Sequence, residues 1–201
     1  MTYEEVLNQL ESLGTAQNRK IYSRHGCDIE QFGVSTANLK KVLKSIKKDE
    51  ELGYKLFSSQ NADAITLSQW IVNIQKLTID EIEAKILCSN YYMLIEYVIP
   101  HIVAKDFEKS LHCIDKWLHH KEPRFRQAGY SLYGIVLSVY PDDMLDMNHI
   151  QNELDWIKDT ILTPMLSTIS GIDDKSIPGY IPNGTYTIKI SSYYNNYTQG
   201  F

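Results

Sequence analysis

A tyrosine and a glutamate stand four positions apart in the segment SNYYMLIEY, residues 89–97. In a helix, Tyr92 and Glu96 would share one face, because residues at i and i+4 lie one above the other. An aromatic ring beside a carboxylate can hold a cationic ligand through cation–π attraction and charge. The pair is therefore a candidate cation site; the alternative is an ordinary half-buried helix surface.

Lysines dominate the segment from residue 38 to residue 48. At helical spacing, three of them fall on one face and two lie beside it: Lys40, Lys44 and Lys47, then Lys41 and Lys48. Such a ridge can contact the phosphates of a DNA duplex and release their counterions. The alternative is the solvated side of an amphipathic helix.

Two arginines, Arg124 and Arg126, stand near the start of a segment whose later apolar residues predict a helix over 123–139. The planar guanidinium group of Arg126 could hold a phosphate through two parallel hydrogen bonds. We group Arg124 with it as a second candidate DNA contact. A structural salt bridge to a neighbouring helix is an equally good interpretation.

The charge distribution restricts any nucleic-acid surface to the first part of the chain. The formal net charge is −5, which disfavours loose binding to polyanions. Residues 1–48 nevertheless hold eight Lys and Arg against five Asp and Glu, whereas the remaining residues hold twelve against twenty. A DNA-binding face should therefore be local and include this basic segment.

Several classes of protein receive no support from the sequence. No Walker loop, GxGxxG, HExxH or GxSxG motif is present. Cys27, Cys88 and Cys113 form no CxxC pair, which argues against a zinc ribbon and a disulfide framework. With no secretory signal and no long apolar run, we expect a cytoplasmic protein with reduced thiols.

The elements that position these residues should be helices almost throughout. Apolar residues recur at helical spacing to about residue 160, with breaks at polar, Pro or Gly positions. We expect helices from the N-terminus to Gly14 and then at about 16–24, 36–46, 50–58, 62–77, 79–88, 91–104 (kinked at Pro100), 107–119, 123–139 and 149–162. Short connections make neighbouring helices antiparallel.

The fold class follows from this pattern. Helix pairs spaced by about 40 residues are typical of a HEAT-like (armadillo-type) superhelical stack, which is all-α. We expect residues 1–170 to form this solenoid domain. Residues 171–201, rich in Gly, Pro, Asn, Ser and Tyr, are predicted to be an irregular, non-helical C-terminal tail.

Four segments together resemble the DNA alkylation repair family of AlkD-like, HEAT-like repeat DNA glycosylases. They are QNRKIYSRHG (residues 17–26), FGVS (32–35) leading into a Leu-Lys helix, LFSSQNADA (56–64) and RQA (126–128). The resemblance covers roughly residues 1–140 and implies a C-shaped solenoid that clasps duplex DNA. Active members of the family excise cationic N3- and N7-alkylpurines by hydrolysing the glycosidic bond, without a metal or cofactor.

The resemblance also implies roles for particular residues. The Trp-x-x-x-Asp pair of the family falls on Tyr92 and Glu96, and its backbone-gripping arginine falls on Arg126. These three residues are the candidate catalytic set. Tyrosine keeps an aromatic face, and glutamate keeps the charge but places it about one methylene further out.

Three functions are therefore open. The first is a DNA alkylation repair glycosylase that acts on duplex DNA with alkylated bases, and the second is a non-catalytic DNA-binding paralogue. It could instead be a HEAT-repeat scaffold for protein interactions, since helical solenoids often present a groove to other proteins. In the DNA-binding interpretations we expect a monomer that uses no cofactor, metal or membrane.

Overall fold

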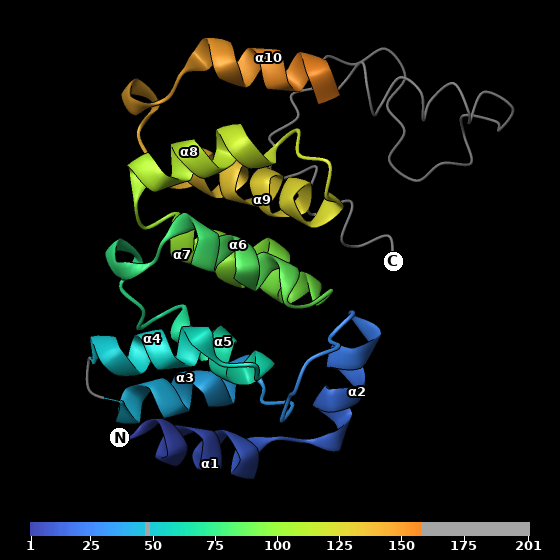
Figure 1. Ribbon diagram of the computed structural model, residues 1–201, viewed down its shortest axis with the longest axis vertical. Helices are drawn as coiled ribbons and strands as arrows, with labels where there is room; N and C mark the ends of the chain where they lie inside the picture. Colours follow the sequence, from blue (N-terminus) through green and yellow to red (C-terminus); the bar gives the residue numbers. More distant parts are fainter. Residues whose placement is uncertain (47–48, 158–201) are drawn as a thin grey trace, which may run out of the picture. The chain divides into compact units, whose positions relative to one another are not determined.

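The computed structural model describes residues 1–46 and 49–157. These residues belong to two compact units, Met1–Val136 and a second unit that begins at Leu137 (Figure 1). Within the described residues the regular elements are all helical, and the one extended pairing is an isolated bridge between Glu30 and Asn61. The predicted all-α, HEAT-like class is therefore confirmed.

Local capping rules explain the first three helices, α1 (Tyr3–Leu13), α2 (Ala16–Arg24) and α3 (Thr36–Ser45). Thr2 and Glu5 form a reciprocal capping box at the start of α1. The side chains of Thr15 and Ser35 accept hydrogen bonds from the third amide of α2 and α3, respectively. These helices begin where the sequence predicts.

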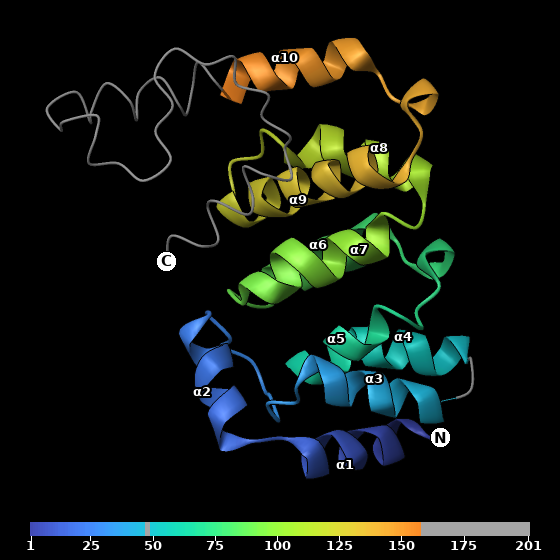
Figure 2. The same ribbon diagram turned by 180° about the vertical axis from the view of Figure 1, so that it is seen from behind.

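The rest of the first unit continues as stacked helices, and the view from behind shows the same order along the stack (Figure 2). They are α4 (Glu50–Ser58), α5 (Ala62–Ser68), η1 (Ile74–Lys76), α6 (Ile79–Leu87), η2 (Met93–Val98), α7 (Ile99–Val103), α8 (Phe107–Trp117) and α9 (Pro123–Val139). The single helix predicted over 62–77 is wrong. It ends at Ser68, and the Asn73 side chain caps a separate one-turn helix by accepting from the amide of Gln75.

Apolar side chains from successive helices fill the first unit. In its N-terminal part, α1, α3, α4 and α5 bury a common cluster that includes Val6, Leu10, Leu39, Leu56 and Leu67. Further along, Trp117 of α8 is fully buried against α9, where Gly129 leaves the necessary space: a Cβ there would lie 3.1 Å from Cβ of Trp117. Burying a large apolar side chain contributes about 1.5–3 kcal/mol, so this core stabilises the stack.

The described part of the second unit contains the end of α9, η3 (Asp142–Met144) and α10 (Met147–Ile157). Asp146 begins α10 by accepting hydrogen bonds from the amides of Asn148 and His149. The predicted helix at 149–162 thus starts two residues earlier, and the predicted tail, residues 171–201, lies outside the described residues. Among residues 1–46 and 49–157, no helix is long and apolar enough to cross a membrane.

Candidate functional site

The segment that carries Tyr92 and Glu96 is an unusual helix. Residues Met93–Val98 form a π-helical turn, in which the amide of Ile99 donates to the carbonyl of Leu94, five residues earlier. Pro100 follows as the second residue of α7. The kink predicted at Pro100 therefore takes the form of a change from π- to α-helix, and π-helical turns occur often at functional sites.

Tyr92 and Glu96 lie close enough to influence each other. Both side chains are half-buried. Burial raises the pKa of the Glu96 carboxyl to about 6. Burial also raises the pKa of Tyr92, and the negative charge of Glu96 adds to that rise. An aromatic face thus stands beside a carboxylate that is partly shielded from water.

The end of α2 holds Tyr92 in place. The amide of Tyr92 donates to the carbonyl of His25 at 3.3 Å, and the two rings meet edge to face with centroids 4.9 Å apart. The neighbouring ring of Tyr91 is buried 5.1 Å from that of Tyr22. Tyr91 and Tyr92, which precede η2, are therefore packed against Tyr22 of α2 and against His25, the residue that follows this helix.

The carboxylate of Asp28 also joins the segment after α2 to the segment before η2. Asp28 accepts hydrogen bonds from the hydroxyl of Ser89 at 2.5 Å and from the amide and side-chain nitrogen of Asn90 at 3.0 and 2.8 Å. Gly26 has φ +84°, and a Cβ there would lie 2.5 Å from the carbonyl oxygen of Asn90. The close approach of these two segments therefore requires glycine at this position.

A second buried carboxylate, Asp63, shapes the loop between α2 and α3. It accepts hydrogen bonds from the amides of Phe32, Gly33 and Val34 at 2.6, 3.0 and 2.8 Å. Burial raises the pKa of Asp63, while the three amide donors act in the opposite direction. Sequence reasoning did not assign a role to Asp28 or Asp63, although FGVS and NADA, the two segments that this contact joins, both carry the family resemblance.

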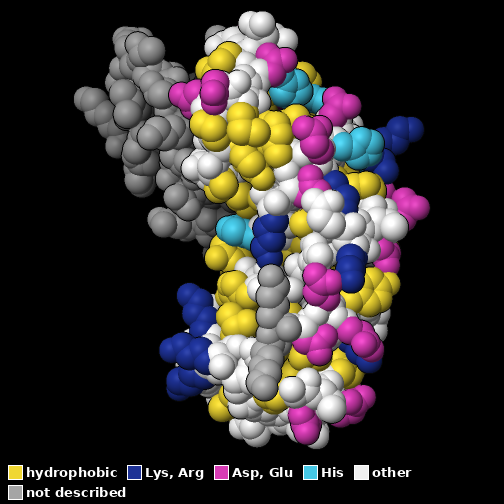
Figure 3. All heavy atoms as spheres, turned by 90° about the vertical axis from the view of Figure 1, so that its left-hand side faces the viewer, with side chains coloured by type: hydrophobic (Ala, Val, Ile, Leu, Met, Phe, Trp, Pro, Cys, Tyr) yellow, Lys and Arg dark blue, Asp and Glu magenta, His cyan; other side chains and the backbone are white. Residues whose placement is uncertain are grey.

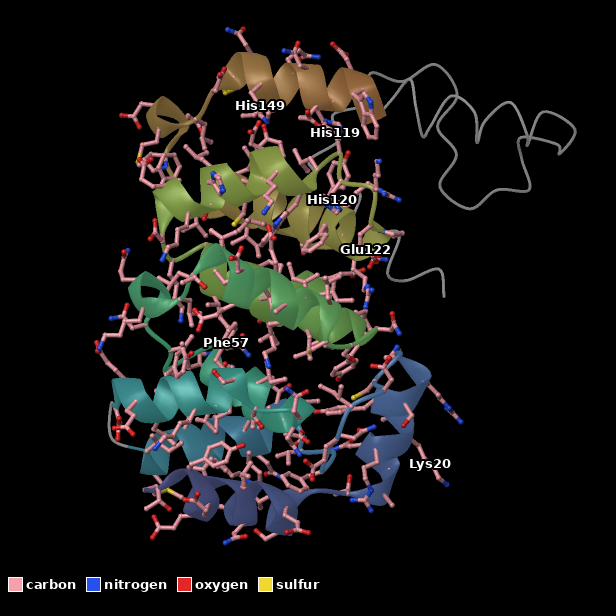
Figure 4. The ribbon with its side chains drawn as sticks, in the orientation of Figure 1. Lys20, Phe57, His119, His120, Glu122 and His149 are labelled. Atoms are coloured by element: carbon pink, nitrogen blue, oxygen red, sulfur yellow. The ribbon has the colours of Figure 1, made fainter. Side chains whose placement is uncertain are left out.

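The two candidate arginines make contacts within the connection from α8 to α9 and its surroundings. Arg126 donates from one nitrogen to the carbonyls of His120 and Lys121 at 2.6 and 2.8 Å, and no ion pair joins it to Glu96. Arg124 pairs with Glu122 at 2.8 Å and donates to the carbonyl of Leu87. Figure 4 shows His120 and Glu122 in this connection. One nitrogen of Arg126 is thus engaged within the protein, and its predicted contact with the DNA backbone stays a prediction.

The lysines of α3 are exposed, as an electrostatic contact surface requires. Lys40 and Lys44 point to solvent without an acidic partner in the described residues, and Lys41 donates to the side chain of Asn38 at 3.1 Å. The predicted contacts Lys47 and Lys48 lie outside the described residues. At the level of the N-terminal helices, Figure 3 shows Lys and Arg side chains gathered at one edge of the surface.

Helix α2 adds cations that the sequence analysis did not single out. It has no buried residue, carries Arg19, Lys20 and Arg24, and contains no Asp or Glu. All three cationic side chains are exposed, and Lys20 projects outward from the helix (Figure 4). We call the cations of α2 and α3, Arg19, Lys20, Arg24, Lys40, Lys41 and Lys44, the N-terminal basic surface.

Most other lysines in the described part of the first unit already have partners. Lys55, Lys76 and Lys116 form salt bridges with glutamates at 2.6–2.7 Å. Three further lysines donate to backbone carbonyls earlier in the chain: Lys85 to Ser59, Lys105 to Gln69 and Lys109 to Ile74. Except for Lys55, whose partner Glu51 lies on the same helix, these lysines link different elements of the stack. The lysines of the N-terminal basic surface form no ion pair with the described residues.

Comparison with known proteins identifies the family. The family model of DNA alkylation repair enzymes matches residues 6–135, which span α1 to most of α9. The chain belongs to the DNA alkylation repair enzyme family. The match includes the N-terminal basic surface, the Asp63 contact and the Tyr92–Glu96 pair. All candidate site residues described in the first unit therefore lie within the region that matches the family.

Individual relatives of this family member are distant. Uncharacterized proteins of Listeria innocua serovar 6a and Listeria monocytogenes serovar 1/2a are each 25% identical to it over 147 residues. The matched region covers 71% of this chain and 65% of each relative, so the match spans about two thirds of their length.

A solved structure shows the same fold. It is described as that of a new family of proteins related to the HEAT-like repeat DNA glycosylases with affinity for branched DNA structures. The TM-score is 0.73 with 23% sequence identity, and the match covers 99% of this chain and 94% of the other. The two proteins therefore share the HEAT-like fold at low sequence identity.

Proposed function

We propose that this protein binds duplex DNA through its N-terminal basic surface. The observation that carries the proposal is that α2 and α3 hold three cations each and no carboxylate. Exposed cations without acidic partners can contact phosphates and release condensed counterions. The negative net charge of the chain comes from the residues after position 48, because residues 1–48 have an excess of three positive charges.

Family membership supports this proposal and extends it to alkylated bases. A purine alkylated at N3 or N7 carries a positive charge, and the Tyr92–Glu96 pair offers an aromatic face and a carboxylate to receive it. With the pKa of Glu96 raised to about 6, the group is mainly ionised at neutral pH yet is poorly solvated. A poorly solvated charge interacts more strongly with a cation than a fully hydrated one does.

In the proposed reaction the N-glycosidic bond of the alkylated purine is hydrolysed. The bond between C1′ and the purine nitrogen breaks, and its electron pair leaves with the base and neutralises its positive charge. Positive charge then develops on the sugar, where Glu96 stabilises it. Water adds to C1′ and loses one proton to solvent, so the products are the free base and an abasic site.

A specific observation favours a second candidate function, DNA binding without catalysis. Arg126, the residue expected to grip the DNA backbone, already donates from one of its nitrogens to two carbonyls of the protein. The ring of Tyr92 also packs against the ring of His25, and this contact restricts the movement of the tyrosine toward a ligand. The protein of the similar solved structure is described as having affinity for branched DNA, which makes branched DNA a candidate ligand for this chain as well.

One experiment separates these functions. The purified protein is incubated with duplex DNA that carries N7-methylguanine, and the released base is measured while binding is followed over a salt series. Release that is lost in Glu96→Gln would support the glycosylase. Salt-dependent binding to duplex or branched DNA without release would support the non-catalytic function. No binding to either DNA would contradict the proposal and leave the protein-interaction scaffold.

A further inference from the structure

A second aromatic pair lies on the same helical segment as Tyr92 and Glu96. Tyr97 is 45% exposed, and its ring centroid lies 4.1 Å from that of His101, with the two planes inclined at 41°. Tyr97 is one of few large hydrophobic or aromatic side chains that the described residues leave open to solvent. It is not one of the buried core residues, so filling the core does not require an aromatic ring at this position.

The backbone orients this pair. Nδ1 of His101 lies 2.8 Å from the carbonyl oxygen of Tyr97. A carbonyl only accepts hydrogen bonds, so Nδ1 carries a proton, and in the neutral ring Nε2 is then left as an acceptor. This hydrogen bond orients the His101 ring next to the Tyr97 ring before any ligand arrives, which lowers the entropic cost of binding.

The pair and the candidate cation site lie on one helical segment. Met93, Tyr97 and His101 recur every four residues and form a row on the solvent side of η2 and α7, one position after the row of Tyr92 and Glu96. The opposite side of the segment is buried and includes Leu94, Ile95, Val98, Ile99, Ile102 and Val103. Tyr97 therefore follows Glu96 directly in the chain but lies on the neighbouring, more exposed side of the same segment.

The chemistry of this row selects one kind of ligand. Residues 93–103 contain no Lys or Arg, so the row offers little to a phosphate. Its aromatic faces suit the flat face of a nucleobase, which stacks on aromatic side chains regardless of sequence. A base inside an intact duplex exposes only its edges in the grooves, so the face becomes available only when the base is unpaired.

We infer that Tyr97 and His101 form a stacking platform for an unpaired nucleobase of bound DNA. Nε2 of His101 can accept a hydrogen bond from the amino group of adenine, cytosine or guanine. The inference rests on the proposed DNA binding. It adds a second site on the segment that carries Tyr92 and Glu96, and it requires no chemistry at Glu96.

The test uses a duplex with one bulged 2-aminopurine and the same duplex fully paired. The wild-type protein should bind the bulged DNA more tightly and quench the fluorescence of the unpaired 2-aminopurine. Tyr97→Ala should weaken binding to the bulged DNA about tenfold and leave binding to the paired duplex unchanged. Tyr97→Phe, which keeps the ring, should behave like the wild type.

Tyr54 on α4 provides the matched control, because it is a similarly exposed tyrosine (39%) outside the proposed platform. Its hydroxyl donates a hydrogen bond to Glu81. Tyr54→Ala should not change the preference for bulged DNA. Unchanged preference and quenching in Tyr97→Ala would overturn the platform while leaving DNA binding intact. If the wild type binds neither DNA, the proposed function itself fails, and the two failures are thus distinguishable.

Discussion

The hydroxyl of Ser131 on α9 donates a hydrogen bond to the backbone carbonyl of Glu96. In an α-helix this carbonyl would accept from the amide of residue 100, but that residue is proline and has no amide hydrogen. A serine 35 residues further along the chain therefore supplies the missing donor. The contact joins α9 to the π-helical turn that carries Tyr92 and Glu96.

Removing this donor should destabilise the fold. Ser131→Ala should lower the free energy of unfolding by about 1 kcal/mol, because the partly buried carbonyl of Glu96 loses a partner. In a Pro100→Ala background the same substitution should cost less, since the new amide at position 100 can donate to Glu96. A double-mutant cycle by urea denaturation measures the coupling, and additive effects would contradict this role of Ser131.

Asp63 should be among the most sensitive positions in the described chain. Asp63→Ala leaves the amides of Phe32, Gly33 and Val34 without their acceptor, and each buried unpaired amide costs about 1–3 kcal/mol. We expect a loss of about 4 kcal/mol in the free energy of unfolding. Asp49→Ala, which removes the single cap bond of α4 to Leu52, is the control and should cost about 1 kcal/mol.

Glu96 should reduce stability at neutral pH. Because burial raises its pKa from 4.5 to about 6, the folded protein binds more protons than the unfolded chain between those values. The contribution of Glu96 to stability therefore falls as the pH rises through this window. At pH 7, Glu96→Gln should be more stable than the wild type by about 1 kcal/mol after allowance for solvent exposure, and the difference should vanish near pH 4.5.

Glu81 provides a control for that measurement, because its pKa is shifted in the opposite direction from that of Glu96. Its hydrogen bonds from Tyr54 and Thr78 lower its pKa, so its contribution to stability is lost as the pH falls. Glu81→Gln should be less stable than the wild type at pH 7, and this gap should narrow in acid. Thermal unfolding between pH 4 and pH 7 measures both variants, and parallel curves for the two would contradict the assignment of Glu96.

The N-terminal basic surface predicts a change in the salt dependence of DNA binding. Lys40→Ala and Lys44→Ala should each weaken binding to duplex DNA, and each should reduce the slope of log K against log salt by about 1. Lys55→Ala is the control, because Lys55 is already paired with Glu51 at 2.7 Å. Fluorescence anisotropy across a salt series gives both quantities, and equal slopes for all three variants would exclude α3 from the interface.

Local sequence determined most of the helices. The capping box of Thr2 and Glu5, the cap at Ser35 and the boundaries of α9 follow from residues within one helical turn of each other. The spacing of Tyr92 and Glu96 likewise placed them on one helical segment before their surroundings were known. Such features depend on a few neighbouring dihedral angles, so a single sequence suffices to predict them.

Tertiary structure decided which partner each polar side chain has. Only the fold shows that Arg126 is held by the carbonyls of His120 and Lys121, that Asp63 holds a loop 30 residues away, and that α2 has no buried residue. Lysines of similar sequence context likewise differ: Lys85 reaches the carbonyl of Ser59 in the interior, whereas Lys44 stays in solvent. The physical reason is that burial and hydrogen bonding are set by segments distant in sequence, and helical periodicity alone carries no information about which of those segments meet.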